Sequence, residues 1–284
     1  MNKFILMLAS LIAGFIMNAQ VKTPQPSPKS SLTQMVGLTE VKVDYSRPSA
    51  KGRVIYGNVV PFGKVWRTGA NENTMVSFSE DVMVGGTTLK KGKYALFTKP
   101  KAEMWEVYFY SDVENWGTPE KWDDAKVAAK ANVVPVALTA PVETFTVSVG
   151  NVTNDNATLD IVWEKTLVSV KFDVPTQKMA MASIEKTLAG PTAGDYYSSA
   201  QYFYQSNGDM NKALEYINKA ISMNKSGTDI PFWYTRLKSL IQAKSGDKKG
   251  AVETAKLSLA AAEKAKNDEY VKMNNESIKE WSKK

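Results

Sequence analysis

The 284-residue sequence contains no cysteine and no histidine. Without cysteine the chain can form no disulfide and offers no thiolate nucleophile. Without histidine it lacks the commonest metal ligand and the usual general base near neutral pH. Zinc sites with Cys or His ligands and the Ser-His and Cys-His dyads are therefore excluded, and we expect neither a cofactor nor a metal ion. Chemistry by carboxylates alone, by a Ser-Lys pair or by calcium is formally open, but no residue spacing supports it.

Long apolar runs are scarce, and the main one lies at the N-terminus. Residues 4–16 are apolar, Lys3 precedes them, and Ala19 offers a small residue before Gln20. A run this short predicts a secretory signal peptide over residues 1–19 and not a membrane span. No cysteine follows that could carry a lipid anchor. We therefore expect a mature protein that is periplasmic or secreted, with no transmembrane segment.

Strongly clustered charge is also missing. The formal net charge is +7, and most of the excess is lysine spread over the second half of the chain. There is no arginine cluster and no alternation of basic and aromatic residues, so we expect no nucleic-acid partner. A hydrophobic content of 43% is ample for packed cores.

The first half of the chain has the pattern of strands. A Pro- and Ser-rich linker over residues 20–37 comes first and is expected to be extended. Over residues 38–174, apolar and polar residues then alternate in short runs separated by turn residues, and Gly85-Gly86 predicts a hairpin. This pattern predicts an antiparallel β-sandwich or jelly-roll-like domain.

The second half, residues 175–284, has the apolar spacing of helices, so the fold class is α+β in two segregated parts. A Gly-Asp step at Gly208 recurs at Gly246, and small residues follow both copies. This resembles tetratricopeptide hairpins, whose repeat is about 34 residues long. We expect the hairpins either to cap the β domain or to bind an envelope protein. Their expected packing residues are Tyr197, Ala200, Tyr204, Gly208, Ala213, Ala220, Gly246 and Ala251.

The least regular stretch is residues 46–74, which we call the central loop. Glycines and prolines interrupt every period there, and a loop of this length is more often a working surface than a connector. It carries five Lys or Arg residues against one acid, which suits an anion or a polyhydroxyl ligand. We predict a site for a carbohydrate or another small polar or anionic ligand, formed by Arg47, Lys51, Arg53, Trp66, Arg67, Asn71, Glu72 and Trp116.

Two other interpretations of the central loop stay open. In the first, the loop only plugs one end of the sandwich, with Arg67 paired to Glu72 and with an apolar set formed by Ile55, Phe62, Val65 and Trp66. In the second, Glu72 and either Asp44 or Asp123 form a carboxylate pair that cleaves glycosides. Scaffolding of protein partners by the helical half is a third alternative for the whole chain.

The tryptophans divide into two groups. Trp105 and Trp163 lie in alternating runs, and we expect both in the core because large aromatics dominate sandwich interiors. Trp116 and Trp122 lie in an irregular stretch beside Asn and Asp residues. Surface aromatic residues next to Asn and Asp are typical of sugar-binding sites. We therefore expect this stretch to form the ligand site together with the central loop.

Several motifs in order carry a family resemblance. They are SRPSAKGRVIYG, VPFGKVWRTGANENT, GGTTLKKGKYALFTKP, the Trp105 strand, the Asn115-Trp116-Gly117 step and NDNATLDIVWEKTLVSV. Over residues 38–174 the chain resembles the bacterial family called domain of unknown function 2911. The resemblance implies an exported, β-rich protein, and it supplies no activity, substrate or catalytic residue. The positions that match the family's VWRTGANE segment are Trp66, Arg67, Gly69, Asn71 and Glu72.

These observations together predict an exported protein of the cell envelope. Binding or interaction is favoured over catalysis because the side chains most used as nucleophile, base or metal ligand are missing.

Overall fold

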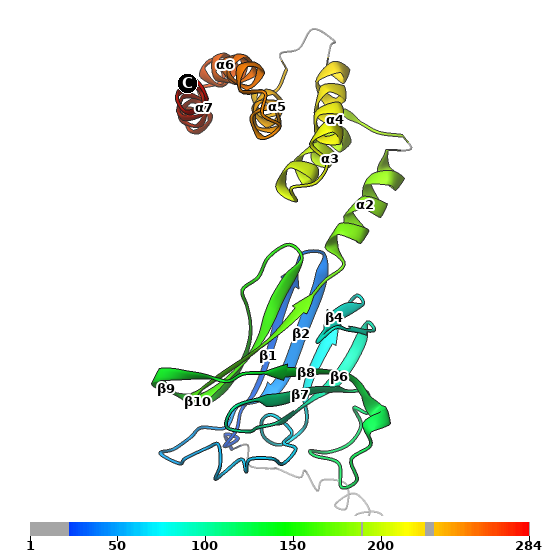
Figure 1. The fold of residues 1–284 in the computed structure, drawn as a ribbon, viewed down its shortest axis with the longest axis vertical. Helices are drawn as coiled ribbons and strands as arrows, with labels where there is room; N and C mark the ends of the chain where they lie inside the picture. The colour runs from blue at the N-terminus through cyan, green and yellow to red at the C-terminus, as the bar shows by residue number, and fades with distance from the viewer. Residues whose placement is uncertain (1–22, 189, 225–229, 284) are drawn as a thin grey trace, which may run out of the picture. The chain divides into compact units, whose positions relative to one another are not determined.

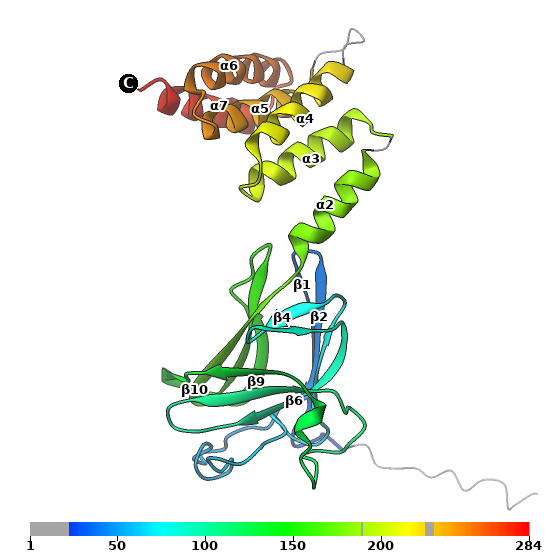
Figure 2. The same cartoon turned by 45° about the vertical axis from the view of Figure 1, so that its right-hand side comes forward.

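A computed structural model describes residues 23–188, 190–224 and 230–283. The predicted signal peptide lies outside these residues. The chain divides into two compact units. Of the described residues, 23–34, 40–151 and 158–172 form the β unit, and 35–39, 152–157, 173–188, 190–224 and 230–283 form the helical unit. Figures 1 and 2 show strands in the first unit and helices in the second. The predicted segregation of strands and helices is confirmed.

The β unit contains two antiparallel sheets. The larger sheet has the strand order β1-β2-β3-β6-β7-β8, and the smaller has the order β5-β4-β10-β9. A short 3-10 helix, η1, spans Asp124–Lys126. The strands are β1 Lys29–Val36, β2 Thr39–Ser46, β3 Thr74–Phe78, β4 Val82–Val84, β5 Thr87–Leu89, β6 Gly92–Lys99, β7 Trp105–Tyr110, β8 Val127–Val133, β9 Val136–Gly150 and β10 Asn156–Asp173.

The two sheets bury one apolar face each against the other. The Phe78 ring of β3 lies 5.5 Å from the Phe172 ring of β10. Trp105 and Trp163 are 1% and 2% exposed, so their predicted place in the core is confirmed. Aromatic pairs of this kind add to the free energy gained by burying apolar area.

The turn between β4 and β5 and the edge strand β1 compare differently with the predictions from the sequence. The turn at Gly85-Gly86 joins β4 to β5, as its two glycines predict. The linker prediction needs a correction, because Lys29–Val36 forms β1 at the edge of the larger sheet. Most of its side chains are exposed or half-buried, so the strand has no apolar alternation by which it could be recognised.

The helical unit begins just after β10. Its helices pack as neighbours in the chain, with α3 against α4, α5 against α6 and α6 against α7. Asp209 and Asp247 cap the second helix of each pair, where the repeated Gly-Asp step predicts a helix start. The helices are α2 Thr176–Thr187, α3 Ala193–Gln205, α4 Met210–Met223, α5 Phe232–Lys244, α6 Lys248–Lys264 and α7 Asp268–Trp281.

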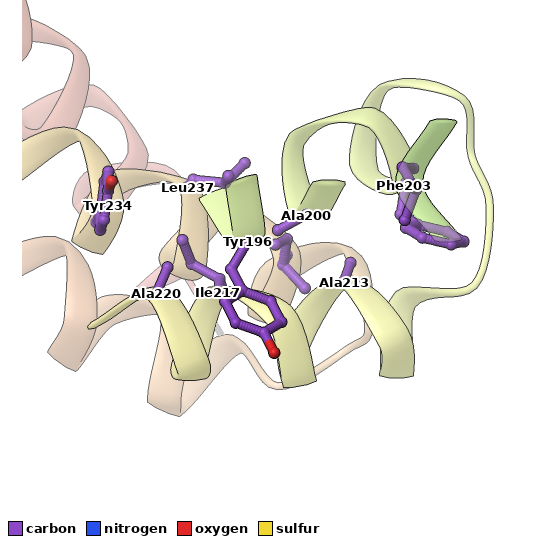
Figure 3. Close-up of a cluster of buried hydrophobic side chains, with 10 residues drawn as sticks. Tyr196, Ala200, Phe203, Ala213, Ile217, Ala220, Tyr234 and Leu237 are labelled. Carbon is purple, nitrogen blue, oxygen red and sulfur yellow. The ribbon is translucent and has the colours of Figure 1, made fainter. Parts of the chain in front are cut away.

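Small residues let the paired helices approach closely. Ala200, Ala213, Ala220 and Ala251 are 0% exposed. Figure 3 shows the cluster in which α3, α4 and α5 meet around such residues, with aromatic side chains of α3 in it. Two of those aromatics, Tyr196 and Phe203, are buried and were not among the expected packing residues.

The remaining expected packing residues have other positions. Tyr197 stacks on Tyr234 at 4.7 Å between ring centroids, and Tyr204 is half-buried beneath Lys244 Nζ. Gly208 and Gly246 lie between helices, and Gly246 has φ of 91°, a conformation that favours glycine.

Candidate functional site

Backbone hydrogen bonds tie the central loop to both sheets. Trp66 and Thr98 of β6 exchange two N–H···O bonds of 2.7 and 2.9 Å. On the other side, Ala50 N–H donates to Glu143 O, and Phe145 N–H donates to Pro48 O, both at 2.8 Å. The loop therefore closes one end of the sandwich as a fixed element, and its side chains have defined positions.

The middle of the loop has an unusual backbone. Thr68, Gly69 and Asn71 have φ values of 55°, 144° and 57°. A β-branched residue in the left-handed region is strained, and Thr68 is also fully buried. Its hydroxyl donates to Thr98 Oγ1 at 3.1 Å, which helps to hold the conformation. Strain of this kind is typical of functional sites, and here it lies next to Arg67.

Aromatic rings form the floor beneath this segment. The Trp66 ring stacks on Trp163 with centroids 6.1 Å apart and an angle of 18°, and it meets Phe145 edge-on at 5.5 Å. Ile55 is fully buried, but Phe62 is 47% exposed. The loop thus plugs the sandwich through Ile55 and Trp66, whereas the expected plugging role of Phe62 is wrong.

Above this floor lies an open cleft of about 640 Å³. Three of the predicted cations, Lys51, Arg53 and Arg67, line it together with Trp66 and Trp163. Among the described residues no Asp or Glu lines it. We call it the cationic cleft. Its other lining residues are Pro26, Ser27, Pro48, Ser49, Val59, Val60, Gly69, Ala70 and Thr118.

Arg67 is the arginine of the cleft whose side chain has no partner among the described residues. Within the described part of the chain its side chain makes no hydrogen bond and no ion pair, and its Nε atom is buried. The expected pairing with Glu72 is wrong, since Glu72 pairs with Lys29 at 2.8 Å. Arg53 differs from Arg67, because its guanidinium donates to Ala50 O at 2.9 Å and to Ser49 O at 2.8 Å. Arg67 therefore has the larger unused hydrogen-bonding capacity.

Four of the predicted site residues do not line the cleft, namely Arg47, Asn71, Glu72 and Trp116. The Arg47 guanidinium donates to Phe145 O at 3.0 Å and to Thr146 Oγ1 at 2.8 Å, so it joins the loop to β9. The Asn71 amide donates to Ser27 O at 3.2 Å. Trp116 is 69% exposed, and its neighbour Thr118 lines the cleft in its place.

Trp122 and Asp123 lie outside the cleft as well. The Trp122 ring packs against Phe97 and Tyr110, and its Nε1–H donates to Asp124 Oδ1 at 2.8 Å. Asp123 caps η1 by accepting from Ala125 N–H at 3.0 Å. Neither side chain is available to the predicted sugar site.

Two of the three carboxylates considered for glycoside cleavage lie in a second cavity. Glu72 and Asp44 both line this cavity of about 470 Å³. The hydrogen bond from Lys29 lowers the pKa of Glu72. Partial burial raises the pKa of Asp44, but hydrogen bonds from Ser31 and Lys42 outweigh it, so the net shift is downward. A glycosidase needs one carboxyl with a raised pKa to protonate the leaving group, and these two shifts have the opposite sign.

The described residues also contain no group of three or more Asp or Glu side chains arranged to hold a metal ion. None of the helices that the structure describes has the length and apolar character needed to cross a membrane.

The sequence did not indicate the roles of two residues that line the cleft, Trp163 and Thr118, or of Thr68, which is buried next to Arg67. The alternating pattern of its strand predicts that Trp163 lies in the core, and Trp163 is indeed buried. It also lines the cleft. The sequence gives no indication of the conformation of Thr68, because threonine is β-branched and disfavours a positive φ. Thr118 follows the Asn115-Trp116-Gly117 step, and that step is the signal by which it could have been found.

The comparisons with known proteins add one finding. A family model described as "Protein of unknown function (DUF2911)" matches residues 27–172. Searches of the curated proteins and of the solved structures found no match. The family match ends with the β unit, so the tetratricopeptide-like nature of the helical unit stays a prediction.

Proposed function

We propose that this chain, which belongs to the DUF2911 family of proteins of unknown function, binds a small anionic ligand in the cationic cleft without transforming it. The observation that carries the proposal is the charge of the cleft. Lys51, Arg53 and Arg67 line it, no described carboxylate does, and the Arg67 side chain has no partner among the described residues.

Physical chemistry favours an anion at such a place. A buried donor without an acceptor costs about 1–3 kcal/mol, and a ligand oxygen that meets it recovers that free energy. Arginine suits this task because its planar fork binds carboxylate or phosphate with two parallel hydrogen bonds. The indoles of Trp66 and Trp163 lower the local dielectric and strengthen the attraction. A volume of about 640 Å³ is within the usual range for small-molecule sites.

The residue types present in the chain and in the cleft favour binding over catalysis. The chain has no histidine and no cysteine. Of the carboxylates considered as catalysts, Glu72 and Asp44 line a different cavity and Asp123 caps η1. The cleft can hold and orient an anion, but its three cations offer no base or nucleophile poised near neutral pH.

We infer further that the mature protein is periplasmic or secreted. The basic and apolar N-terminus supports export, as does a chain that holds no cysteine to be oxidised. Contact with an envelope protein through the helical unit is a second candidate function. It is favoured by a groove that Tyr204, Trp233 and Tyr270 line, in which Trp233 is 40% exposed.

The test of anion binding is a calorimetric titration of the chain from residue 20 onward. The panel holds phosphate, sulfate, acetate, sugar acids and aromatic acids, with neutral saccharides for comparison. We expect at least one anion to bind, and Arg67→Gln to weaken it by roughly tenfold or more, since hydrogen bonds to charged groups are worth about 1.5–3 kcal/mol. Affinity should fall as salt is added.

The matched control is Lys64→Gln, which removes one positive charge from an exposed position of the same loop that does not line the cleft. It should change affinity less than twofold. Neutral saccharides that bind as tightly as anions, or an Arg67→Gln variant with unchanged affinity, would show that the proposal is wrong.

A further inference from the structure

Residues 115–118 lie between β7 and β8 and border the cationic cleft through Thr118; we call them the tryptophan segment. Gly117 lies directly on the Arg67 side chain, because a Cβ atom added to Gly117 would be only 3.2 Å from Arg67 Nη1. Gly117 has φ of 71°, so glycine serves both the close approach and the turn. Thr118 lines the cleft. The segment thus covers part of the guanidinium that we assign to the anion.

The base of the segment is held in place. Asn73 Nδ2 donates to Asn115 O at 2.7 Å, and Asn115 Nδ2 donates to Gly117 O at 2.6 Å. Asn73 immediately precedes β3 and is 5% exposed, so the anchor belongs to the body of the β unit. The residue between these anchored positions is Trp116, whose place beside the cleft is therefore defined.

The Trp116 side chain contrasts with its anchored neighbours. It is 69% exposed, and in the described part of the chain it makes no hydrogen bond and no ring contact. The two tryptophans of the cleft floor are stacked on each other, so each has a face already covered. The Trp116 ring therefore has free surface two residues from Thr118, which lines the cleft, and a flat partner stacked on this ring would remove apolar surface from water.

We propose that Trp116 is a ligand-binding residue of the cationic cleft, and that the ligand is a ring-bearing anion, whose acidic group meets Arg67 while a flat face of its ring stacks on Trp116. This inference rests on the proposed function and narrows its ligand class. A sugar ring and an aromatic ring both present such a face, so sugar acids and aromatic acids share the required chemistry. Neither a small ion without a ring nor a neutral sugar satisfies both residues.

Calorimetry on the chain from residue 20 separates these classes. The probes are glucuronate and benzoate as ring-bearing anions, acetate and phosphate as anions without a ring, and glucose as a ring without charge. We expect at least one ring-bearing anion to bind tenfold more tightly than acetate and phosphate. Trp116→Ala should remove this preference and leave acetate and phosphate within twofold. The stronger of glucuronate and benzoate then identifies the kind of ring.

Two further measurements guard against a merely structural effect. Trp233→Ala, which removes another exposed tryptophan from the helical unit, should leave every affinity unchanged. The difference in acrylamide quenching between the wild type and Trp116→Phe measures the quenching of Trp116 alone. This difference should decrease when the ring-bearing anion is added, because the ring of the ligand then covers the indole. Circular dichroism checks that each variant is folded.

The outcomes separate this inference from the proposed function. If ring-bearing anions bind no more tightly than acetate, if Trp116→Ala keeps the preference, or if quenching does not change, the role of Trp116 is wrong. Anion binding still stands in each of these cases if Arg67→Gln weakens it. If Arg67→Gln leaves all affinities unchanged, both proposals are wrong.

Discussion

Arg67 owes its position to neighbours in costly backbone conformations. Thr68 at φ 55° costs about 1–2 kcal/mol more than a right-handed conformation would. Its hydroxyl bond to Thr98 and the hydrogen bond that Thr74 Oγ1 donates to Thr68 O offset part of this cost. The strained turn leaves the Arg67 side chain in the cleft, where the Arg67→Gln variant tests it. The strain thus lies next to a cation whose side chain has no partner among the described residues.

A second residue with an unusual environment is Glu106 on β7, at the surface of the larger sheet. Its carboxylate accepts from Tyr108 Oη at 2.6 Å and from Lys130 Nζ at 3.2 Å, and two more lysines, Lys99 and Lys101, lie at 3.8 and 3.7 Å. The bond from Tyr108, with the nearby lysines, lowers the pKa of Glu106 from 4.5 to about 2. The folded state therefore favours the ionised form.

This shift predicts a pH-dependent contribution to stability. At pH 7 we expect Glu106→Gln to lower the free energy of unfolding by about 1 kcal/mol. Because the folded pKa lies below the unfolded one, the contribution is complete above pH 4.5 and is lost as the pH falls toward 2. Urea unfolding of both proteins across this range measures the difference. A gap that stays constant down to pH 2 contradicts the prediction.

The matched control for this measurement is Glu103→Gln. Glu103 lies just before β7, and its side chain makes no ion pair within the described residues. Removal of its charge should have little effect at any pH, since isolated surface charges contribute little.

At the scale of single elements, helix starts are decided by short polar side chains. The Asp209 carboxylate accepts from Asn211 N–H at 2.9 Å and from Lys212 N–H at 3.2 Å at the start of α4. These are two of the amide groups that have no partner inside the helix. The negative charge also interacts favourably with the positive end of the helix dipole.

The cap makes a direct prediction for α4. Asp209→Ala should lower the stability of the helical unit by about 1 kcal/mol, because two amide donors lose their acceptor. Thermal unfolding followed by far-UV circular dichroism measures the change. Asp209→Ser keeps a side-chain acceptor and should recover most of the loss, and Glu215→Ala, at an exposed position inside α4, should be near neutral. An equal loss in the Ala and Ser variants would show that the cap is not the cause.

For the whole molecule, the main fact is that it has two separate cores. Ile161 on β10 is 1% exposed in the β unit, and Ile217 on α4 is 0% exposed in the helical unit. Each unit buries its own apolar side chains, which is the condition for a domain to unfold on its own. Five of the seven tryptophans lie in the β unit, so fluorescence reports mainly on that unit.

We therefore expect two variants to act on different signals. Ile217→Ala should lower the stability of the helical unit by about 3 kcal/mol through lost burial and a residual cavity, and it should leave the fluorescence transition in place. Ile161→Ala should move the fluorescence transition by a comparable amount and leave most of the helical circular dichroism signal. If both signals move together in both variants, the two units unfold as one.

Local patterns in the amino-acid sequence account for the division of this protein into strands and helices. Residues that alternate with period two became strands, and residues spaced by three and four became helices, because these periods reflect which side of an element is buried. Local chemistry also settled the hairpin at Gly85-Gly86 and the caps at Asp209 and Asp247. In each case the signal and the structure that it specifies lie within a few residues of each other.

The edge strand and the set of residues that line the cleft depend instead on contacts between distant parts of the chain. Strand β1 pairs through its backbone, which leaves no pattern in its side chains. Arg47 and Arg67 look alike in the sequence, yet one is bound to β9 and the other is left without a partner. Glu72 pairs with Lys29, and Gly117 covers Arg67, across 43 and 50 residues of chain (72 − 29 and 117 − 67). Contacts at such separations depend on how strands and turns are placed in space, and local periodicity does not record that.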